Sequence, residues 1–153
     1  MPLFTADILK TKLQPNQRLM GLDLGEKTIG LALSDPGLVV ATPYETIHRS
    51  KFKPDARRIV SLIQEYDVQA LVVGWPLNMN GSEGPRCQST RQFVQNFLSF
   101  HDVPIALWDE RLSTKAMDDV MISFDVSRQK RAHAIDKAAA SFILQGFLES
   151  LRF

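Results

Sequence analysis

The 153-residue sequence predicts an α/β fold, with a five-stranded mixed sheet flanked by helices on both faces. Two apolar runs flank residues 25–27, which is typical of a β-hairpin. Residues 70–74 form a short, wholly apolar run, which indicates a strand covered on both faces. Segments with helical spacing of apolar residues separate the later strands, as expected for parallel strands joined by crossover helices.

The first hairpin places a carboxylate near the end of an apolar strand. Side chains alternate between the faces of a strand, so Leu19, Gly21 and Asp23 share one face. In the return strand, Gly30 and Ala32 belong to a face of small side chains, against which another element can pack closely. An ionised carboxylate among apolar residues is costly unless it is solvated, paired or bound to a cation. Asp23 is therefore a candidate functional residue, with a solvated aspartate beside a turn as the alternative.

The remaining elements follow in order along the chain. Pro43 in the third predicted strand indicates an edge position or a bulge. Residues 75–85 are rich in turn formers and follow a buried strand, so they form either a surface loop or a loop that faces a substrate. The predicted strands span 19–24, 29–35, 38–47, 70–74 and 103–110, and the predicted helices span 55–66, a segment around 93–98, a segment opening at 113–114, and 134–151.

Two further carboxylates lie where this topology can bring them close to Asp23. Glu110 ends the fifth predicted strand, and Asp136 lies on the apolar stripe of the last helix with Ala140 and Ile143. For Asp136, a favourable interaction with the helix dipole is the alternative. Crowded carboxylates repel and raise one another's pKa, and a divalent cation with a preference for oxygen ligands relieves that repulsion. The three acids therefore predict a site for Mg²⁺ or Mn²⁺.

Composition limits the classes of function. The net charge of +1 argues against a general nucleic-acid-coating protein, but basic clusters at 48–58 and 128–133 are candidates for phosphate contact or for solvated surface. We expect the second cluster to lie in a loop. A single cysteine excludes an intramolecular disulfide and suits a reducing compartment, so we expect a cytoplasmic location. Residues 1–17 are expected to be an N-terminal leader and 18–153 a single domain, without a membrane-spanning segment.

Four sequence blocks, in this order, resemble the YqgF/RuvX family of RNase H-like nucleases, which is named for both pre-16S rRNA processing and Holliday junction resolution. The blocks are residues 21–35, 73–84, 108–114 and 136–144. The resemblance extends from about Arg18 to Leu148, and Thr28 stands where the family usually carries arginine. It implies an RNase H-like sheet and assigns Asp23, Glu110 and Asp136 as the catalytic and metal-binding triad.

The sequence therefore predicts a metal-dependent endonuclease that hydrolyses phosphodiester bonds. Contacts to phosphates position a substrate without reading its bases, so we expect recognition of nucleic-acid structure. Processing of the 5′ end of precursor 16S rRNA is the preferred function, and resolution of four-way DNA junctions is the alternative. The candidate phosphate-binding residues are Lys27, Arg111, Arg128, Lys130 and Arg131.

Two other classes of function remain open from the sequence. The first hairpin also resembles the first phosphate-binding element of actin-like ATPases and sugar kinases, although those enzymes need a second large domain around the nucleotide. A non-catalytic nucleic-acid-binding domain of the same fold is the other possibility. The expected partner is structured RNA or branched DNA, with no membrane, and the expected oligomeric state is a monomer or a weak homodimer.

Overall fold

The computed structural model describes the backbone of residues 3–4, 6–78, 80–109 and 128–151, and side chains at 7–78, 80–109 and 138–151. The strands are β1 (Leu3–Phe4), β2 (Arg18–Leu24), β3 (Thr28–Ser34), β4 (Ala41–His48), β5 (Val68–Trp75) and β6 (Ile105–Asp109). The helices are α1 (Ala6–Lys10), α2 (Phe52–Tyr66), α3 (Pro85–Phe100) and α5 (Arg128–Ser150). The strands form one mixed sheet in the order β1-β6-β5-β2-β3-β4, in which β1 adds a short sixth strand to the five predicted ones.

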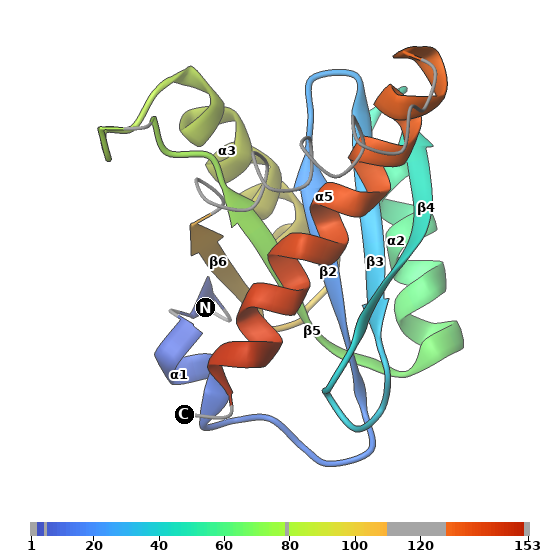
Figure 1. The fold of residues 1–153 in the computed structure, drawn as a ribbon, viewed down its shortest axis with the longest axis vertical. Coiled ribbons are helices and arrows are strands. Elements are labelled where there is room, and N and C mark those ends of the chain that lie inside the picture. The colour runs from blue at the N-terminus through green and yellow to red at the C-terminus, as the bar shows by residue number, and fades with distance from the viewer. Residues whose placement is uncertain (1–2, 5, 79, 110–127, 152–153) are drawn as a thin grey trace.

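Helices cover both faces of the sheet, as predicted. Helix α5 crosses one face diagonally, while α2 and α3 pack on the other (Figure 1). Each face has its own apolar core. Phe93 and Phe97 of α3 and Leu62 of α2 belong to one core, and Ile143 and Phe147 of α5 belong to the other. The sheet thus forms the middle layer between the two cores.

The alternation predicted for the first hairpin is confirmed. Leu22 and Leu24 are buried in the core beneath α2 and α3, whereas Leu19 is buried in the core beneath α5. Strands β2 and β3 are antiparallel, and Asp23 is paired with Gly30. Because Asp23 is two residues beyond Gly21 and four beyond Leu19, it lies on the face that α5 covers.

Gly21 sets how closely α5 approaches the sheet. A Cβ atom on Gly21 would lie 2.7 Å from the Ala140 carbonyl oxygen and 2.8 Å from Leu144 Cβ. Both distances are too short for a real contact, so a side chain at this position would force the helix away from β2. The absence of a side chain therefore lets the α5 backbone rest directly on the strand that carries Asp23.

Strand β4 lies at the sheet edge, and its proline marks a bulge. Leu31 pairs with Glu45 while the next residue, Ala32, pairs with Pro43, so Tyr44 is extra in the ladder. Proline lacks the N–H that a central strand would need, which explains its position at the edge. The sequence predicts an edge position or a bulge at Pro43, and the structure has both.

The segment before β2 packs against the domain. Leu3 and Phe4 of β1 pair in parallel with Ile105 and Ala106 of β6. In α1, Leu9 is only 1% exposed and belongs to the core beneath α5. Burial of this leucine anchors the N-terminal segment to the sheet.

Helix α5 begins earlier than the sequence predicts. Residues 128–133 were expected to form a loop, but Arg128, Lys130 and Arg131 belong to the first turns of the helix. The physical reason is that no glycine or proline occurs between 128 and 145, and Arg, Lys, Gln and Ala all favour helix. The basic cluster is therefore carried on helical backbone. No helix in the described part of the chain combines the length and apolar content needed to cross a membrane.

Candidate active site at the carboxyl ends of the parallel strands

The carboxyl ends of β2, β5 and β6 lie at the same end of the sheet. The three strands are parallel, with Leu22 paired with Val73 and Val73 paired with Leu107. The next row therefore runs from Asp23 through Gly74 to Trp108. Neighbouring strands are about 4.8 Å apart, so Asp23 and the end of β6 are separated by about 10 Å across the sheet. In open α/β sheets, such strand ends are the usual location of a functional site.

Asp23 is half-buried in the last part of β2, between two glycines. Gly30 is its partner in β3, and Gly74 occupies the neighbouring position in β5. Since neither glycine has a side chain, no side chain from the adjacent strands lies directly beside the Asp23 carboxylate on the face that α5 covers. The sequence showed the small residue Gly30 but not that Gly74 would lie on the other side of Asp23.

The α5 backbone leads from the Gly21 contact toward the hairpin that follows Asp23. Ala140 and Leu144 lie at Gly21, and the N-terminal part of α5 extends from there to the hairpin end of the molecule (Figure 1). Asp136 belongs to the turn of α5 that immediately precedes Ala140. The stripe predicted for this helix is confirmed where side chains are described, because Ala140, Ile143 and Phe147 are all buried.

The described end of β6 also follows the predicted alternation. Ile105 and Leu107 pack toward α2 and α3, whereas Ala106 and Trp108 pack toward α5. Glu110 follows directly after Asp109, the last described residue of this strand. By sequence parity it would share the face of Trp108, which is also the face of Asp23.

Several predicted site residues cannot be compared with the structure. Glu110 and Arg111 lie outside the described residues, as do the side chains of Arg128, Lys130, Arg131 and Asp136. Within the side chains that the structure does describe, no group of three or more His, Cys, Asp or Glu residues could hold a metal ion. The triad therefore stays a prediction, in which Asp23 is the member with a described side chain.

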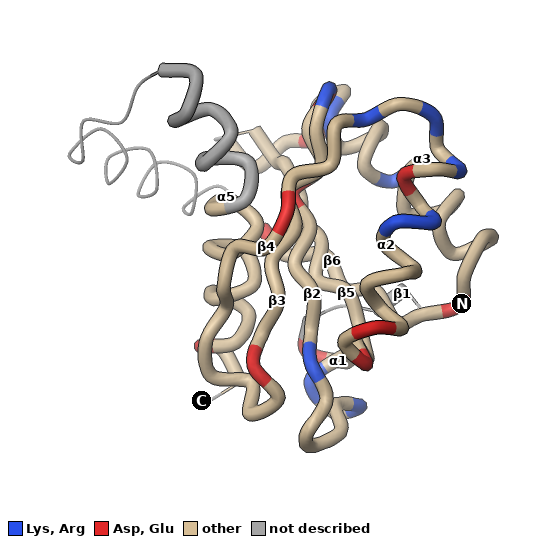
Figure 2. The backbone as a smooth tube through the Cα atoms, turned by 90° about the vertical axis from the view of Figure 1, so that its right-hand side faces the viewer, with Lys and Arg blue, Asp and Glu red and all other residues tan. Residues whose placement is uncertain are grey.

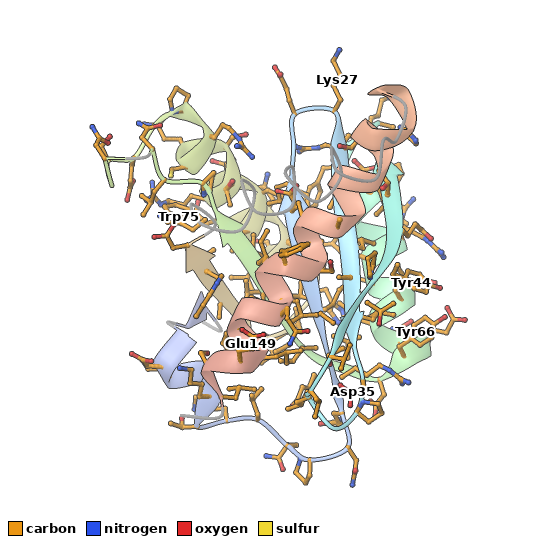
Figure 3. The ribbon with its side chains drawn as sticks, viewed as in Figure 1. Lys27, Asp35, Tyr44, Tyr66, Trp75 and Glu149 are labelled. Atoms are coloured by element: carbon orange, nitrogen blue, oxygen red, sulfur yellow. The ribbon has the colours of Figure 1, made fainter. Side chains whose placement is uncertain are left out.

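Basic residues gather at the same end of the molecule as Asp23. The Lys and Arg positions follow the edge over the β2–β3 hairpin and the adjoining ends of α2 and α3 (Figure 2). Lys27 is exposed at the tip of the hairpin and extends away from the body of the protein (Figure 3). This charge distribution would attract a polyanion to the edge that carries the candidate site.

The first basic cluster divides into two groups. Arg58 donates two hydrogen bonds to the Glu45 carboxylate, at 2.6 and 2.9 Å, and this interaction lowers the pKa of Glu45. Arg49 instead turns to the hairpin, where its Nη1 donates to the Gly25 carbonyl oxygen over 2.6 Å. Arg58 is thus engaged in an ion pair within the fold, whereas Arg49 lies at the end of the sheet where Asp23 lies.

The turn-rich loop after β5 lies at the same sheet edge. The Asn78 N–H donates to the Ser82 carbonyl oxygen over 2.9 Å, which closes the loop on itself. Arg91 of α3 lies 5.2 Å from the centroid of the Trp75 ring and forms an ion pair with Glu83. The loop is largely exposed, and contact with a substrate stays a prediction for it.

Comparison with known proteins relates the chain to nucleases. A protein from Rhizobium meliloti, named "Putative pre-16S rRNA nuclease", is 53% identical over 151 residues, which cover 99% of this chain and 92% of the relative. A protein of the same name from Rhodospirillum centenum is 56% identical over 149 residues, covering 94% of this chain and 79% of the relative.

Solved structures share the fold at low sequence identity. RuvC from T. thermophilus, solved with a Holliday junction substrate, matches with a TM-score of 0.57 and 14% identity over 89% of this chain and 96% of that chain. The resolvase of Fowlpox virus, solved with Holliday junction DNA, matches with a TM-score of 0.50 and 14% identity over 88% of this chain and 99% of that one. The predicted RNase H-like fold class is confirmed.

The family model described as "RuvX: Holliday junction resolvase" matches residues 17–150, which include all four sequence blocks on which the predicted resemblance rests. With this match and the identities above 50%, the chain belongs to the RuvX family of nucleases and resolvases.

Proposed function

We propose that this protein is a metal-dependent endonuclease whose active site lies at the carboxyl ends of β2, β5 and β6. One observation carries the proposal: Asp23 lies one residue before the end of β2, on the face that α5 covers, with a glycine in each neighbouring strand. A half-buried carboxylate near the end of a strand suits the binding of a cation and a phosphate. Membership of a nuclease family supports the same activity.

The proposed metal ligands are Asp23, Glu110 and Asp136. The donor chemistry fits, because carboxylate oxygens are the ligands that Mg²⁺ and Mn²⁺ prefer, and the Asp23 carboxylate is only partly exposed at a strand end. A bound divalent cation supplies Lewis acidity at the phosphodiester group and favours the ionised form of an attacking water. The task of the three residues is to hold that charge in place.

The proposed phosphate contacts come from the hairpin after Asp23, from the residue after Glu110 and from the start of α5. Lys27 extends from the hairpin that directly follows Asp23, so it is placed to meet a substrate that approaches the sheet edge (Figure 3). Arg111 follows Glu110 in the sequence, and Arg128, Lys130 and Arg131 lie in the N-terminal turns of α5. Such contacts hold the backbone of the nucleic acid in register without reading its bases.

The proposed substrate is precursor 16S rRNA, since the relatives reported above are named as pre-16S rRNA nucleases, and we propose cleavage at its 5′ end. A four-way DNA junction is the second candidate, because the description of the matching family model is Holliday junction resolvase. Either substrate requires recognition of nucleic-acid structure. For rRNA processing we infer a cytoplasmic location and a monomer or a weak homodimer.

A parallel cleavage assay separates these functions. Precursor 16S rRNA ends, unstructured RNA and four-way DNA junctions are each incubated with the protein and with Mg²⁺ or Mn²⁺. We expect cleavage of the precursor at a defined position, and we expect EDTA to abolish it. Preferential cutting of the junction would favour the resolvase function. Binding without cleavage of any substrate, unchanged after all three acids are replaced, would identify a non-catalytic binding domain instead.

A further inference from the structure

A cavity lined by several polar side chains lies beside the β2–β3 hairpin, on the opposite face of the sheet from Asp23. It has a volume of about 300 Å³ and lies between the hairpin, the segment that follows β4, and α3. Leu24 and Phe93, which belong to the core beneath α2 and α3, form its apolar wall. Its polar lining consists of Glu26, Arg49, Arg86, Ser89 and Thr90. We call it the hairpin cavity.

Two arginines from distant parts of the chain converge on the hairpin cavity. Arg49 Nη1 donates to the Gly25 carbonyl oxygen over 2.6 Å, and Arg86 Nη2 donates to the Leu24 carbonyl oxygen over 3.4 Å. The acceptors are consecutive carbonyl groups of the same strand end. Two guanidinium groups that bind neighbouring carbonyl groups concentrate positive charge at this strand end, which favours the approach of an anion.

The geometry of Arg49 is fixed in a way that suits an anion. Its guanidinium carbon lies 5.6 Å from the centroid of the Phe93 ring, so the group is held between the hairpin carbonyl and an aromatic side chain. A guanidinium has five N–H donors in a planar fork, and that fork matches the oxygens of a phosphate group. The hydroxyl groups of Ser89 and Thr90 add neutral donors to the lining.

We propose that the hairpin cavity binds a backbone phosphate of the nucleic-acid substrate, away from the bond that is cleaved. This inference rests on the proposed nuclease function. Asp23 and Leu24 are consecutive residues that point to opposite faces of β2, so a strand that reaches both the active site and the cavity must pass around the hairpin. Exposed Lys27 lies at the tip of the hairpin that separates the two sites (Figure 3).

The lining also contains one carboxylate, which gives a second test of the proposal. Glu26 is exposed on the hairpin and lines the same cavity as Arg49 and Arg86. Its negative charge would weaken the binding of a phosphate. Replacement of Glu26 by glutamine should therefore strengthen binding at this site, whereas replacement of Arg86 should weaken it.

The test measures the binding of single-stranded RNA in an Asp23→Asn background, in which no substrate is cut, over a range of KCl concentrations. Loss of one phosphate contact reduces the slope of log K against log[salt] by about 0.7 for a single strand. We expect Arg86→Gln to lower the affinity for RNA about tenfold and to reduce the slope by about 0.7. We expect Glu26→Gln to raise affinity about threefold.

The matched control is Lys12→Gln, which removes the same charge from the end of the molecule where α1 lies, opposite the hairpin (Figure 1). Equal effects of Arg86→Gln and Lys12→Gln would overturn the proposal, because only net charge would then matter. Arg49→Lys keeps the charge but loses the planar fork, so it should also lower affinity if the fork binds phosphate.

A titration with inorganic pyrophosphate, followed by thermal unfolding, distinguishes a free anion from a substrate strand. Stabilisation that Arg86→Gln removes, with RNA binding unchanged, would make the cavity a small-anion site and contradict the strand assignment. The slope of the binding curve tests the cavity proposal, and the cleavage assay tests the nuclease function. An unchanged slope with normal cleavage rejects the cavity proposal alone, and a changed slope without cleavage of any substrate rejects the nuclease function alone.

Discussion

Two aspartates that lie at opposite ends of the β2–β3 pair have different roles. Asp35 follows β3, and its Oδ1 accepts N–H hydrogen bonds from Val39 at 2.7 Å and Val40 at 2.9 Å. These bonds lower the pKa of Asp35 and close the turn that leads to β4. Asp23 lies at the other end, near the end of β2, in a row of the sheet where both neighbours are glycines.

The comparison teaches that a strand-end carboxylate must be judged by its surroundings. Asp35 has backbone donors from its own turn, and Leu38 adopts a left-handed φ of 58° within that turn. Its charge is therefore used locally, for the fold. Asp23 lies beneath α5 at the edge where basic residues gather, which is the setting of a binding site (Figure 2). The two residues should respond to the same substitution in opposite ways.

The largest expected effect is the loss of cleavage in Asp23→Asn. Removal of the charge should lower the rate of cleavage by at least about 100-fold, which corresponds to about 3 kcal/mol of transition-state stabilisation. The melting temperature should change by no more than about 2 °C, because the two side chains have the same shape. Single-turnover cleavage and thermal unfolding measure the two quantities. Asp35→Asn is the matched control, and it should retain cleavage; equal loss of cleavage in both variants would contradict the distinction.

The next largest effect concerns the packing of α5 against β2, beside Asp23. Gly21→Val should lower the free energy of unfolding by about 3 kcal/mol, because its side chain would meet the Ala140 carbonyl and Leu144. Cleavage should also fall, since α5 carries Asp136. Gly146→Ala is the control in the same helix: its Cβ would lie 3.0 Å from Trp108 Nε1, and the expected loss is about 1 kcal/mol. Urea denaturation gives both values, and a fully stable Gly21→Val protein would show that the helix can move.

A smaller effect is expected for Asp35→Asn, and it should depend on pH. The lowered pKa of Asp35 means that its ionised form stabilises the fold above the ordinary aspartate pKa of 3.8, and this contribution is lost as the pH falls through the lowered value. At neutral pH the variant should lose about 1 kcal/mol, because the neutral amide oxygen of asparagine accepts the Val39 and Val40 N–H bonds more weakly than an ionised carboxylate does. Urea denaturation at pH 7 and near pH 3 should show the difference from the unchanged protein closing at acid pH. A constant difference would mean that ionisation plays no part.

The smallest effect is expected for Arg58→Gln, which separates the structural from the binding members of the first basic cluster. The side chains of Arg58 and Glu45 are 43% and 29% exposed, so their ion pair should contribute less than about 1 kcal/mol to stability. Added salt should reduce that contribution further. RNA binding should change no more than in Lys12→Gln. A larger loss of RNA affinity would place Arg58 among the substrate contacts.

Local patterns in the sequence were sufficient to predict most of the sheet. Alternation located the two faces of β2, the apolar run at 70–74 marked the buried strand β5, and Pro43 indicated both an edge and a bulge. Each of these features depends on side chains that are neighbours along one strand. The stripe of Ala140 and Ile143 likewise follows from helical spacing alone.

Features that depend on distant pairs could not be predicted in this way. Arg86 reaches the Leu24 carbonyl across 62 positions of sequence, and no local pattern indicates that contact. The same holds for Gly74 beside Asp23, which follows from the register between β2 and β5. The start of α5 differs from the prediction for another reason: the basic residues at 128–133 suggest a loop, although the Arg, Gln, Lys and Ala residues among them favour helix.

The most direct test of the proposed active site is a crystal structure of the protein with bound Mn²⁺, located by its anomalous scattering. We predict a manganese ion at the carboxyl end of β2. Carboxylate oxygens of Asp23, Glu110 and Asp136 should bind the ion directly, at about 2.0–2.3 Å, or through its bound waters. Manganese bound elsewhere, or the three carboxylates lying too far apart to share one ion or an adjacent pair, would contradict it.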